Sequence, residues 1–432
     1  MIEIDQVNAN FEREPLIRPF GFKGGYLREI WQTAAFVRSS NGNEGVGLCS
    51  QSVLWSDSSV FAAHSESGGN ALMFAVTERA LQMIRGEQFQ SPVKLQEEIL
   101  DELYAYAREV TSNPDLRTTF VLNALVGVDN ALWVLYAREN GITSFQQMLP
   151  EAYKSSLNHR QKQVASVPVI SYGTPISEIK QAVKDGYFFL KIKLGQPGTQ
   201  AEMLEKDKQR LTEIHKAIGD THISHTQNGK IPYYFDANGR YESKDTLLQL
   251  LDHAQKIGAL EQIEIMEEPF PEELTIDVHD IPVRLAADES AHTDEDALER
   301  IEMGYEAIAL KSVAKTMSMT MKIAQVAYEH DVPCFCADLT VNPILIEWNK
   351  IVAANVAPFP GLGMGLLETN GHQNYDNWEK MQSYHPYPDA QWSQTQNGVF
   401  HLGDDFYEKS GGIFETSEHY ADLVRSPMTS DE

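Results

Sequence analysis

Residues 233–239 read YYFDANG, residues 263–269 read IEIMEEP, and residues 283–290 read VRLAADES. Each stretch is an apolar run of the length expected for a fully buried strand, and the runs end in Asp236, Glu267 and Asp288. A carboxylate at the point where a buried strand stops is placed to hold a divalent cation rather than to fill a core. The three runs therefore predict one metal site built from several strands.

Five further apolar runs extend this pattern, with helix-like stretches between most of them: VASVPVISYG (164–173), FFLKIKLG (188–195), AIALKSVA (307–314), PCFCADLT (333–340) and GMGLLETN (363–370). Together the eight runs predict an α/β fold, a modified (β/α) barrel of the TIM type with seven or eight parallel strands. In such a barrel all strands end on one face. The intervals of 31, 21 and 23 residues that separate Asp236, Glu267, Asp288 and Lys311 each have room for a loop, a helix and the next strand, so these groups can converge.

The first part of the chain has a different pattern of apolar residues. Residues 27–49 contain two strand-like runs joined by a polar turn at 41–43, which predicts a hairpin. Apolar residues at helical spacing predict helices at 69–86, 93–111 and 117–140. We therefore predict an N-terminal α+β capping domain over 1–140 and a barrel over 141–375. The C-terminal segment, 376–432, is predicted to return to the capping domain through a strand in QNGVFHLG (396–403), and SPMTSDE (426–432) is predicted to be disordered.

The composition excludes several classes of partner. With 35 Lys and Arg against 62 Asp and Glu, the formal charge is −27, which predicts repulsion from nucleic acid and from anionic membranes. No apolar run reaches the roughly 18 residues that span a bilayer, and no leader pattern begins the chain, so a cytoplasmic protein is expected. Three cysteines, Cys49, Cys334 and Cys336, are too few for a disulfide framework, and we expect the last two to be buried thiols.

The charges of the predicted site indicate its chemistry. Three neighbouring carboxylates raise one another's pKa values, and a divalent cation removes this repulsion. Ligands that are all oxygen atoms favour Mg²⁺ over zinc. The open positions of a bound Mg²⁺ suit a substrate carboxylate, whose α-hydrogen the cation makes acidic.

A base for this hydrogen is also present in the sequence. Lys191 and Lys193 lie two residues apart and share one face of a strand, while Lys311 comes from the far side of the predicted barrel. We expect a lysine beside another cation and a metal to have a lowered pKa, as a general base requires. One lysine on each side of a planar enediolate would let a proton leave one face and return on the other.

These motifs resemble the enolase superfamily, and within it the muconate-lactonizing subgroup of the mandelate racemase/muconate lactonizing enzyme family. FLKIKLG resembles the Lys-x-Lys strand, YYFDANGRY the Asp-x-Asn metal strand, IEIMEEPF the Glu-Glu-Pro strand, LAADES the third-ligand strand and ALKSVAK the sixth-strand lysine motif. VDNALWVLYARENGITSFQQML (128–149) resembles the helix that leads from the capping domain into the barrel. The five strand motifs occur in the family's order.

The resemblance implies a role for each residue that matches a motif. Mg²⁺ would be held by Asp236, Glu267 and Asp288, with Glu268 as a competitor for the position of Glu267. Lys193 and Lys311 would be the two acid/base groups, and Lys191 would bind the substrate carboxylate or lower a neighbouring pKa. Asn238 and Glu289 would orient the ligands and a lysine.

The chain departs from the family pattern at several positions. Met317 and Ser318 replace the Gly-Gly that follows the sixth-strand lysine motif, which puts the loop geometry near Lys311 in doubt. Asp338 stands at the end of the seventh strand, where the mandelate racemase subgroup has a histidine. The eighth strand carries Glu368 and Asn370 instead of Asp-x-Asp, which argues against an amino-terminal dipeptide, although Glu368 could still bind an ammonium or hydroxyl group.

Loops of the first module are expected to close over the barrel mouth, by analogy with the family. Candidates are RPFGFKGGY (18–26) and SQSVLWSDSSVF (50–61). Within them Arg18, Lys23, Tyr26 and Trp55 would contact the distal end of the substrate. His372 is a further candidate acid.

The sequence thus predicts an enzyme that abstracts the proton α to a small-molecule carboxylate through a metal-stabilised enediolate. Lysines on both faces favour a racemase or epimerase. The alternatives are a cycloisomerase, a dehydratase that eliminates from a carboxylic or sugar acid, and a barrel that keeps its metal ligands only as a binding scaffold. The resemblance also implies a homo-oligomer.

Overall fold

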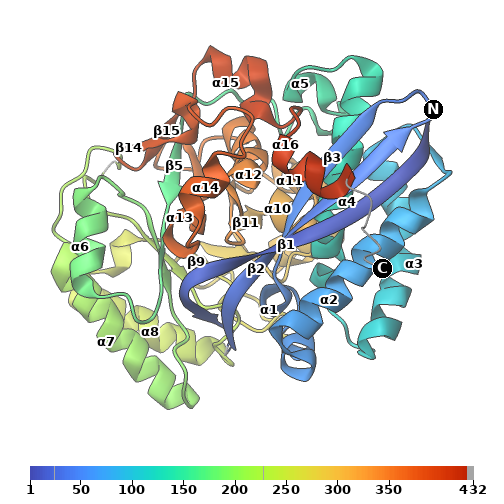
Figure 1. Cartoon of the computed structure of the whole chain (residues 1–432). Helices are drawn as coiled ribbons and strands as arrows, with labels where there is room; N and C mark the ends of the chain where they lie inside the picture. Colours follow the sequence, from blue (N-terminus) through green and yellow to red (C-terminus); the bar gives the residue numbers. More distant parts are fainter. Residues whose placement is uncertain (24, 227, 426–432) are drawn as a thin grey trace.

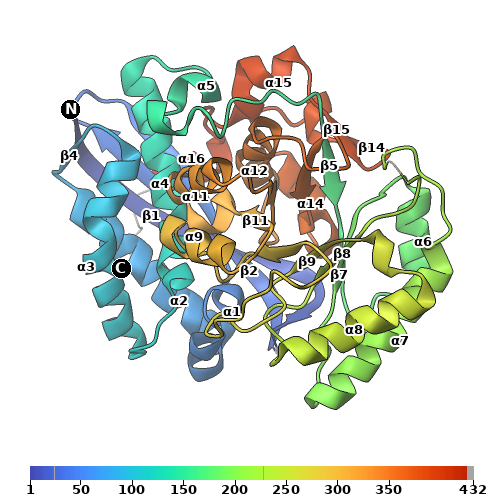
Figure 2. The same cartoon turned by 180° about the vertical axis from the view of Figure 1, so that it is seen from behind.

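The computed structural model describes residues 1–23, 25–226 and 228–425. It contains an N-terminal sheet covered by helices, which lies along one side of a parallel barrel (Figure 1). Figure 2 shows the same two parts from behind. This arrangement confirms the predicted fold class, a TIM-type barrel with an N-terminal α+β domain. The domain boundaries at residues 140 and 375 stay predictions, and the segment SPMTSDE lies outside the described residues.

The N-terminal sheet is antiparallel, with the order β3-β2-β1-β4. Its strands are β1 (Ile2–Phe22), β2 (Gly25–Ser39), β3 (Glu44–Gln51) and β4 (Gln88–Phe89). The predicted hairpin is confirmed as β2 and β3. The long strand β1 was not predicted, because most of its side chains are exposed or half-buried and it lacks a regular apolar alternation.

The three predicted N-terminal helices are confirmed, but the first of them begins earlier than predicted. The helices of this part are α1 (Val53–Ser56), α2 (Ser58–Ile84), α3 (Pro92–Thr111) and α4 (Thr118–Asn140), followed by α5 (Phe145–Met148) and η1 (Glu151–Tyr153). The helix α2 begins well before residue 69, because the Asp57 carboxylate accepts from the backbone N–H groups of Ser59 and Val60 and caps it there.

The helix α4 packs directly on β3 and lies in the core. A Cβ atom on Gly47 of β3 would lie 2.1 Å from the carbonyl oxygen of Gly127, so glycine permits this close approach. By length and composition α4 could cross a membrane, but 94% of its most apolar window is buried inside the protein. Such burial is typical of the core helix of a soluble protein.

All eight apolar runs form barrel strands. These are β5 (Gln163–Val167) and β6 (Val169–Ile170), then β7 (Leu190–Lys193), β8 (Tyr233–Asp236), β9 (Ile263–Glu267), β10 (Leu285–Ala287), β11 (Ala307–Leu310), β12 (Cys334–Cys336) and β13 (Gly365–Glu368). The first run is split at Pro168, which lacks a backbone N–H. Since β6 pairs with β7 and β5 pairs with β13, both in parallel, the split strand closes an eight-stranded barrel.

Helices follow most barrel strands. They are α6 (Ile176–Lys184), α7 (Gln200–Ile218), α8 (Lys244–Ile257), η2 (Leu260–Gln262), α9 (Asp294–Glu302), α10 (Ser312–Lys315), α11 (Met317–Glu329), α12 (Pro343–Asn355), α13 (Gly371–Asn374) and α14 (Trp378–Gln382). The interval between β9 and β10 has room for a helix, but residues 268–284, all of which the structure describes, contain none. Prolines 269, 271 and 282 disfavour one there.

The C-terminal segment makes contact with both parts of the protein. Its elements are η3 (Gln391–Ser393), β14 (Thr395–Gln396), β15 (Val399–His401), α15 (Asp404–Lys409), η4 (Ser410–Gly412) and α16 (Glu418–Arg425). The strand in QNGVFHLG was predicted to join the capping domain, and this is wrong: β15 pairs antiparallel with β5, since Val399 and Phe400 pack into the barrel core. The helix α16 instead meets β1, where Asn10 Nδ2 donates to the Leu423 carbonyl at 3.0 Å.

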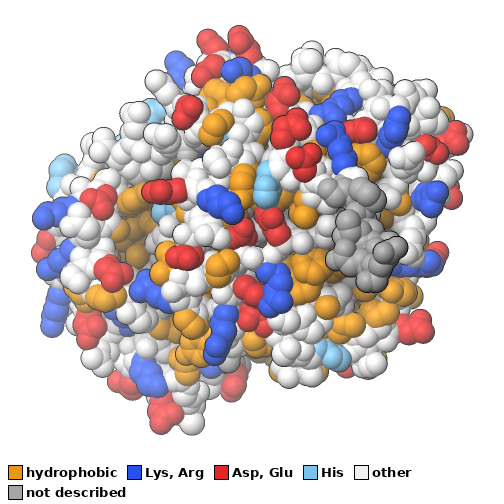
Figure 3. Space-filling view, in the orientation of Figure 1, with side chains coloured by type: hydrophobic (Ala, Val, Ile, Leu, Met, Phe, Trp, Pro, Cys, Tyr) orange, Lys and Arg blue, Asp and Glu red, His pale blue; other side chains and the backbone are white. Residues whose placement is uncertain are grey.

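The face of the molecule in Figure 3 carries no large patch of a single charge sign. Figure 3 shows acidic and basic side chains interspersed over that face. The cysteines are free and buried, as expected for Cys334 and Cys336.

Candidate active site

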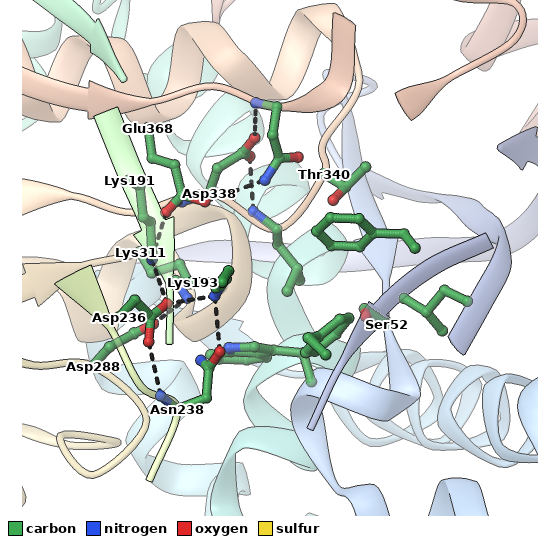
Figure 4. Close-up of a pocket in the computed structure, with 16 residues that line it drawn as sticks. Ser52, Lys191, Lys193, Asp236, Asn238, Asp288, Lys311, Asp338, Thr340 and Glu368 are labelled. Atoms are coloured by element: carbon green, nitrogen blue, oxygen red, sulfur yellow. Dashed lines mark hydrogen bonds and ion pairs between the residues drawn. The ribbon is translucent and has the colours of Figure 1, made fainter. Parts of the chain in front are cut away.

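The predicted acids meet at the carboxyl ends of neighbouring strands, and Figure 4 shows two of them, Asp236 and Asp288. Asp236 and Glu267 are the last residues of β8 and β9 and are paired in register, and Asp288 directly follows β10. All three side chains are buried, and each is at most 1% exposed. Parallel pairing of adjacent strands therefore brings these carboxylates together from positions far apart in the sequence.

Lys191 is a buried cation among three carboxylates. Its ammonium lies 3.0 Å from Asp236 Oδ2, 3.0 Å from Glu267 Oε1 and 2.9 Å from Glu368 Oε2. The side chain points into the barrel from β7, and it lies 5.0 Å from the centre of the Tyr234 ring. Lys191 thus offsets the charge of acids from both sides of the site.

The two predicted acid/base lysines contact different acids. Lys193 Nζ donates to Asp236 Oδ2, and it donates to Asn238 Oδ1 at 2.9 Å. Lys311 Nζ donates to Asp288 Oδ2. In the eight-stranded barrel, β7 and β11 are four strands apart and therefore lie on opposite sides. The two ammonium groups thus enter the site from opposite walls.

The paired glutamates at the end of β9 point to different places. Glu267 Oε1 accepts from Lys191 at 3.0 Å, and Glu267 Oε2 accepts from the Tyr234 hydroxyl. Glu268 has a φ of +41° and its Oε2 accepts from the backbone N–H groups of Asp288 at 2.8 Å and Ser290 at 3.2 Å. Glu268 therefore braces the loop after β10, while Glu267 faces the barrel interior, as a ligand at that position must.

The acids offer room for a hard cation. Ligand oxygens of Glu267, Asp288 and Glu289 lie within 4.8 Å of one another. In the described part of the chain, Asp288 Oδ1 and Glu289 Oε2 are buried without a hydrogen-bond donor. Asp236 does not belong to this closest set, since its carboxylate faces Lys191 and Lys193. A cluster of buried carboxylate oxygens, two of which accept no hydrogen bond, fits Mg²⁺, and Glu289 is one of the three acids of this cluster.

Asn238 and Glu289 connect the lysine, the acids and the capping domain. Asn238 Nδ2 donates to Glu289 Oε1 at 2.8 Å, while its carbonyl oxygen accepts from Lys193. On the other side, Lys23 Nζ lies 3.1 Å from Glu289 Oε1 and donates to the Trp55 carbonyl at 3.2 Å. Lys23 was expected to contact the substrate, and the structure instead pairs it with this acid.

Lys315 is a site residue that the sequence interpretation missed. It is fully buried at the end of α10, and its Nζ donates to the Asp288 backbone carbonyl at 2.6 Å and lies 3.2 Å from Asp288 Oδ1. Asp288 is therefore held between two lysines, Lys311 and Lys315. The signal was present in AIALKSVAK, because a lysine four residues after Lys311 returns to the same side of a helical turn.

The charged groups shift one another's pKa values. Burial raises the pKa of Glu267 to about 8, although Lys191 opposes the shift. Burial also disfavours the charge of Asp236, but its lysine partners outweigh this and lower its pKa to about 2. For Lys191 and Lys311, burial lowers the pKa, but Asp236 and Asp288, respectively, outweigh it, and both pKa values lie above the usual value. The lowering expected for a lysine that faces a bound cation stays a prediction, because the shifts of Lys191 and Lys311 arise from the protein's own carboxylates.

A cavity that is partly open to solvent lies in front of these groups. Besides the lysines, Asp236, Asn238 and Asp288, its lining consists of Phe20, Phe22, Leu27, Ser52, Trp55, Asp338, Leu339, Thr340, Glu368 and Asn370. The lid side of the cavity is thus apolar, and the ends of β12 and β13 add polar groups.

Asp338, Glu368 and Asn370 form one hydrogen-bonded group. The Asp338 carboxylate accepts from the backbone N–H groups of Leu339 at 2.8 Å and Asn370 at 2.8 Å, and Glu368 Oε2 accepts from Asp338 N at 3.1 Å. Asn370 Nδ2 donates to Glu368 Oε1 at 3.2 Å. Burial, and then the charge of Glu368, raises the pKa of Asp338 to about 7.

Of the other loop candidates, Trp55 lines the cavity, whereas Arg18 and Tyr26 line a separate groove between the β1–β2 hairpin and residues 171–174 of the barrel. His372 is not among the described lining residues. It packs edge-on against Trp378, and burial lowers its pKa to about 4, so the side chain is neutral at pH 7.

Comparison with known proteins agrees with this geometry. Residues 176–372 match the family model of enolase C-terminal domain-like proteins, a span that includes β7 to β13. This segment belongs to the enolase superfamily. The enolase resemblance inferred from the motifs is thus confirmed, whereas membership of the muconate-lactonizing subgroup stays a prediction. No curated protein matches the sequence.

Solved structures of enolase-superfamily proteins share the fold over nearly the whole chain. A mandelate racemase/muconate lactonizing protein from Herpetosiphon aurantiacus has a TM-score of 0.62 and 16% identity, covering 93% of this chain and 96% of that one. A dipeptide epimerase from Enterococcus faecalis, complexed with Mg and L-Leu-L-Tyr, has a TM-score of 0.60 and 17% identity, covering 93% and 97%. One from Cytophaga hutchinsonii, complexed with Mg and D-Ala-L-Val, has a TM-score of 0.60 and 19% identity, covering 85% and 87%.

Proposed function

We propose that this chain is a magnesium-dependent enzyme that removes the proton α to a substrate carboxylate, forms an enediolate and returns a proton to the opposite face. The reaction would be a racemisation or epimerisation. The single observation that carries this proposal is the placement of Lys193 and Lys311, which enter one acid-lined cavity from opposite walls of the barrel.

The acids supply the place for the cation. A Mg²⁺ ion bound by Asp236, Glu267 and Asp288 would hold the substrate carboxylate and acidify its α-hydrogen. The same ion would take over the charge that now raises the pKa values of the lysines, so that a neutral lysine becomes accessible. Magnesium in the two dipeptide epimerase complexes supports this choice of cation.

The lysines supply the proton transfers. Lys193 would take the proton from one enantiomer and Lys311 from the other, because each side chain reaches the cavity from its own wall. Lys191, which contacts three carboxylates, would add positive charge on the carboxylate side of the substrate. With a base on each face, the proton can leave one side and return on the other.

Elimination and cycloisomerisation would need only one of these lysines as a base. The second lysine would then only stabilise charge. If the reaction is a dehydration or a cycloisomerisation, part of the activity should therefore remain when the lysine that is not the base is replaced. The non-catalytic scaffold predicts that neither lysine matters.

The test is α-proton exchange in deuterated water with Mg²⁺, followed by NMR for separate enantiomers of candidate acids. Lys193→Ala should abolish exchange of one enantiomer and Lys311→Ala that of the other, each by about a hundredfold or more, since each change removes a general base. Lys184→Ala, an exposed lysine at the end of α6, is the control and should change neither rate. Loss of water without exchange would overturn the racemase proposal, and unchanged rates in both variants would favour the scaffold.

We also propose the partner, the location and the assembly of the enzyme. A net charge of −27 argues against nucleic acid or an anionic membrane surface as a partner, while the three lysines of the cavity supply the local positive charge that a small carboxylate needs. We place the protein in the cytoplasm as a homo-oligomer. Sedimentation at several protein concentrations tests the assembly, and a monomer at all of them would contradict it.

A further inference from the structure

We infer that Tyr234 is a positioning residue of the candidate metal site, and that it selects Mg²⁺ over Ca²⁺ by occupying one carboxylate oxygen of Glu267. This inference rests on the proposed function, since it concerns the cation of the same site. It follows from the place of Tyr234 in the barrel, from its contacts with Glu267 and Lys191, and from the packing of its ring.

Tyr234 lies in the barrel interior below the acids. It stands two residues before Asp236 on β8, so both side chains point to the same face of the strand. The neighbouring strands β9 and β10 contribute Ile265 and Ala286 to the same core cluster. The side chain of Tyr234 is 1% exposed. Tyr234 is therefore placed to contact the site from the core and not from the solvent.

The Tyr234 hydroxyl gives the two oxygens of Glu267 different surroundings. It donates to Glu267 Oε2, whereas Glu267 Oε1 accepts from Lys191 at 3.0 Å. The phenol takes up a lone pair of Oε2 and the space beside it. A cation that approaches Glu267 therefore meets Oε1 more easily than it meets both oxygens at once.

The Tyr234 ring is held firmly in this position. Phe335 of β12 packs edge-on against it, with ring centres 5.4 Å apart and planes at 78°, and the Phe189 ring lies 6.1 Å away. On the polar side, the Lys191 ammonium lies 5.0 Å from the ring centre. Because a closely packed interior keeps side chains in fixed rotamers, the fold orients Glu267 before any cation binds.

The number of oxygens that Glu267 offers distinguishes the two cations. Mg²⁺ demands near-ideal octahedral geometry and retains several waters, so one oxygen from each carboxylate is enough. Ca²⁺ takes about six to eight oxygens and binds both oxygens of a carboxylate in many sites. A glutamate that offers one oxygen therefore fits Mg²⁺ and leaves Ca²⁺ with too few ligands.

Calorimetric titration of the metal-free protein with MgCl₂ and with CaCl₂ tests the inference without a substrate. Tyr234→Phe removes only the hydroxyl, and the affinity for Mg²⁺ should fall about tenfold to a hundredfold, as it does when other partners of metal ligands are lost. The affinity for Ca²⁺ should fall by about threefold or less, because Glu267 can then offer both oxygens. The ratio of the two affinities is the readout, since a loss of packing alone would weaken both cations.

Tyr233→Phe is the matched control. Tyr233 is the preceding residue on β8 and is fully buried, but its side chain points to the opposite face, where its hydroxyl lies 3.0 Å from His215 Nδ1. The same substitution there should change the affinity for either cation by about twofold or less. An equal loss of Mg²⁺ affinity in both variants would overturn the inference, as would an unchanged ratio in Tyr234→Phe.

A crystal structure of the wild type with Mg²⁺ gives an answer that does not depend on the folding of a variant. We expect one oxygen of Glu267 at about 2.0–2.1 Å from the ion and the other within about 3 Å of the Tyr234 hydroxyl. Both oxygens of Glu267 on the ion, with the phenol displaced, would contradict the role of Tyr234.

The outcomes separate this inference from the proposed function. Mg²⁺ binding by the wild type with an unchanged ratio in Tyr234→Phe would overturn the role of Tyr234 and leave the proton abstraction standing. A changed ratio, combined with the unchanged exchange rates in Lys193→Ala and Lys311→Ala that the scaffold predicts, would support the role of Tyr234 and overturn the proposed reaction. Absence of Mg²⁺ binding by the wild type would overturn both.

Discussion

The Lys311 ammonium lies 4.4 Å from the centre of the Trp55 ring, so the capping domain touches a predicted catalytic lysine directly. Trp55 belongs to α1, is 4% exposed and also lines the cavity. A desolvated cation–π contact of this kind is worth about 2 kcal/mol. The N-terminal domain therefore lines the cavity as well as covering it.

Replacing Trp55 should impair one face of the reaction. In Trp55→Leu we expect the enantiomer handled by Lys311 to exchange its α-proton roughly tenfold to thirtyfold more slowly, because the ammonium loses the ring that positions it. Exchange of the other enantiomer should change by about twofold or less. Trp31→Leu, which removes a buried indole from the capping sheet, is the control. Equal loss for both enantiomers would show that the ring shapes the whole cavity instead.

Lys315 should balance the charge of Asp288 before the cation binds. Removing one partner of a buried ion pair costs about 3–5 kcal/mol, so Lys315→Met should lower the free energy of unfolding by up to that amount without Mg²⁺, since Lys311 still pairs with Asp288. The more negative site should then attract Mg²⁺ more strongly. Thermal unfolding with and without MgCl₂ should therefore show a larger stabilisation by Mg²⁺ in the variant than in the wild type.

A matched control exists for this experiment. Lys350 is also fully buried and pairs with Glu347 at 2.7 Å, on α12 and outside the cavity lining. Lys350→Met should lower stability by a similar amount but leave the increment from Mg²⁺ unchanged. A smaller Mg²⁺ increment in Lys315→Met than in the wild type would mean that Lys315 holds Asp288 in position for the cation.

Asp129 should make stability depend on pH. This α4 carboxylate accepts from the Ser318 backbone N–H at 3.0 Å and from its hydroxyl, and burial raises its pKa from 3.8 to about 6. A carboxyl with a raised pKa in the folded state binds its proton more tightly there, so stability is lost as the pH rises from about 4 to about 6. Two pKa units correspond to about 3 kcal/mol.

The measurement compares Asp129→Asn with the wild type by urea unfolding at several pH values. We expect the variant to gain stability relative to the wild type between pH 4 and pH 6, by up to about 3 kcal/mol. Asp101→Asn, an exposed carboxylate on α3, controls for the loss of one charge and should show no such trend. A difference that stays constant across this range would contradict the assignment.

Ser318 also shows why part of the structure escaped prediction. The replacement of Gly-Gly by Met317 and Ser318 left the loop near Lys311 in doubt, and the structure resolves it through long-range contacts. Met317 and Ser318 begin α11, and Ser318 binds Asp129 and accepts from Trp133 Nε1 at 3.0 Å, so the start of this helix is held by α4, whose Trp133 lies 185 residues earlier in the chain. Such partners leave no local pattern in the sequence.

The barrel and its acids were predictable because they follow local rules. A buried parallel strand is a continuous apolar run, and a carboxylate or lysine at its end must lie on the catalytic face, which located Asp236, Glu267, Asp288 and Lys311. Features set by tertiary contact were not predictable in this way. The pairing of β15 with β5, the ion pair of Lys23 with Glu289, and the direction of the pKa shift of Lys311 each depend on neighbours distant in sequence.

The most direct measurement of the central claim is the position of the cation in crystals soaked with Mn²⁺, located by anomalous scattering. The account predicts one strong peak at the ends of β8, β9 and β10, with carboxylate oxygens of Asp236, Glu267 and Asp288 each about 2.0–2.3 Å away. A peak held by Glu289 without Asp236 would contradict the proposed ligand set. Absence of any peak between these acids would contradict the metal-assisted proton abstraction itself.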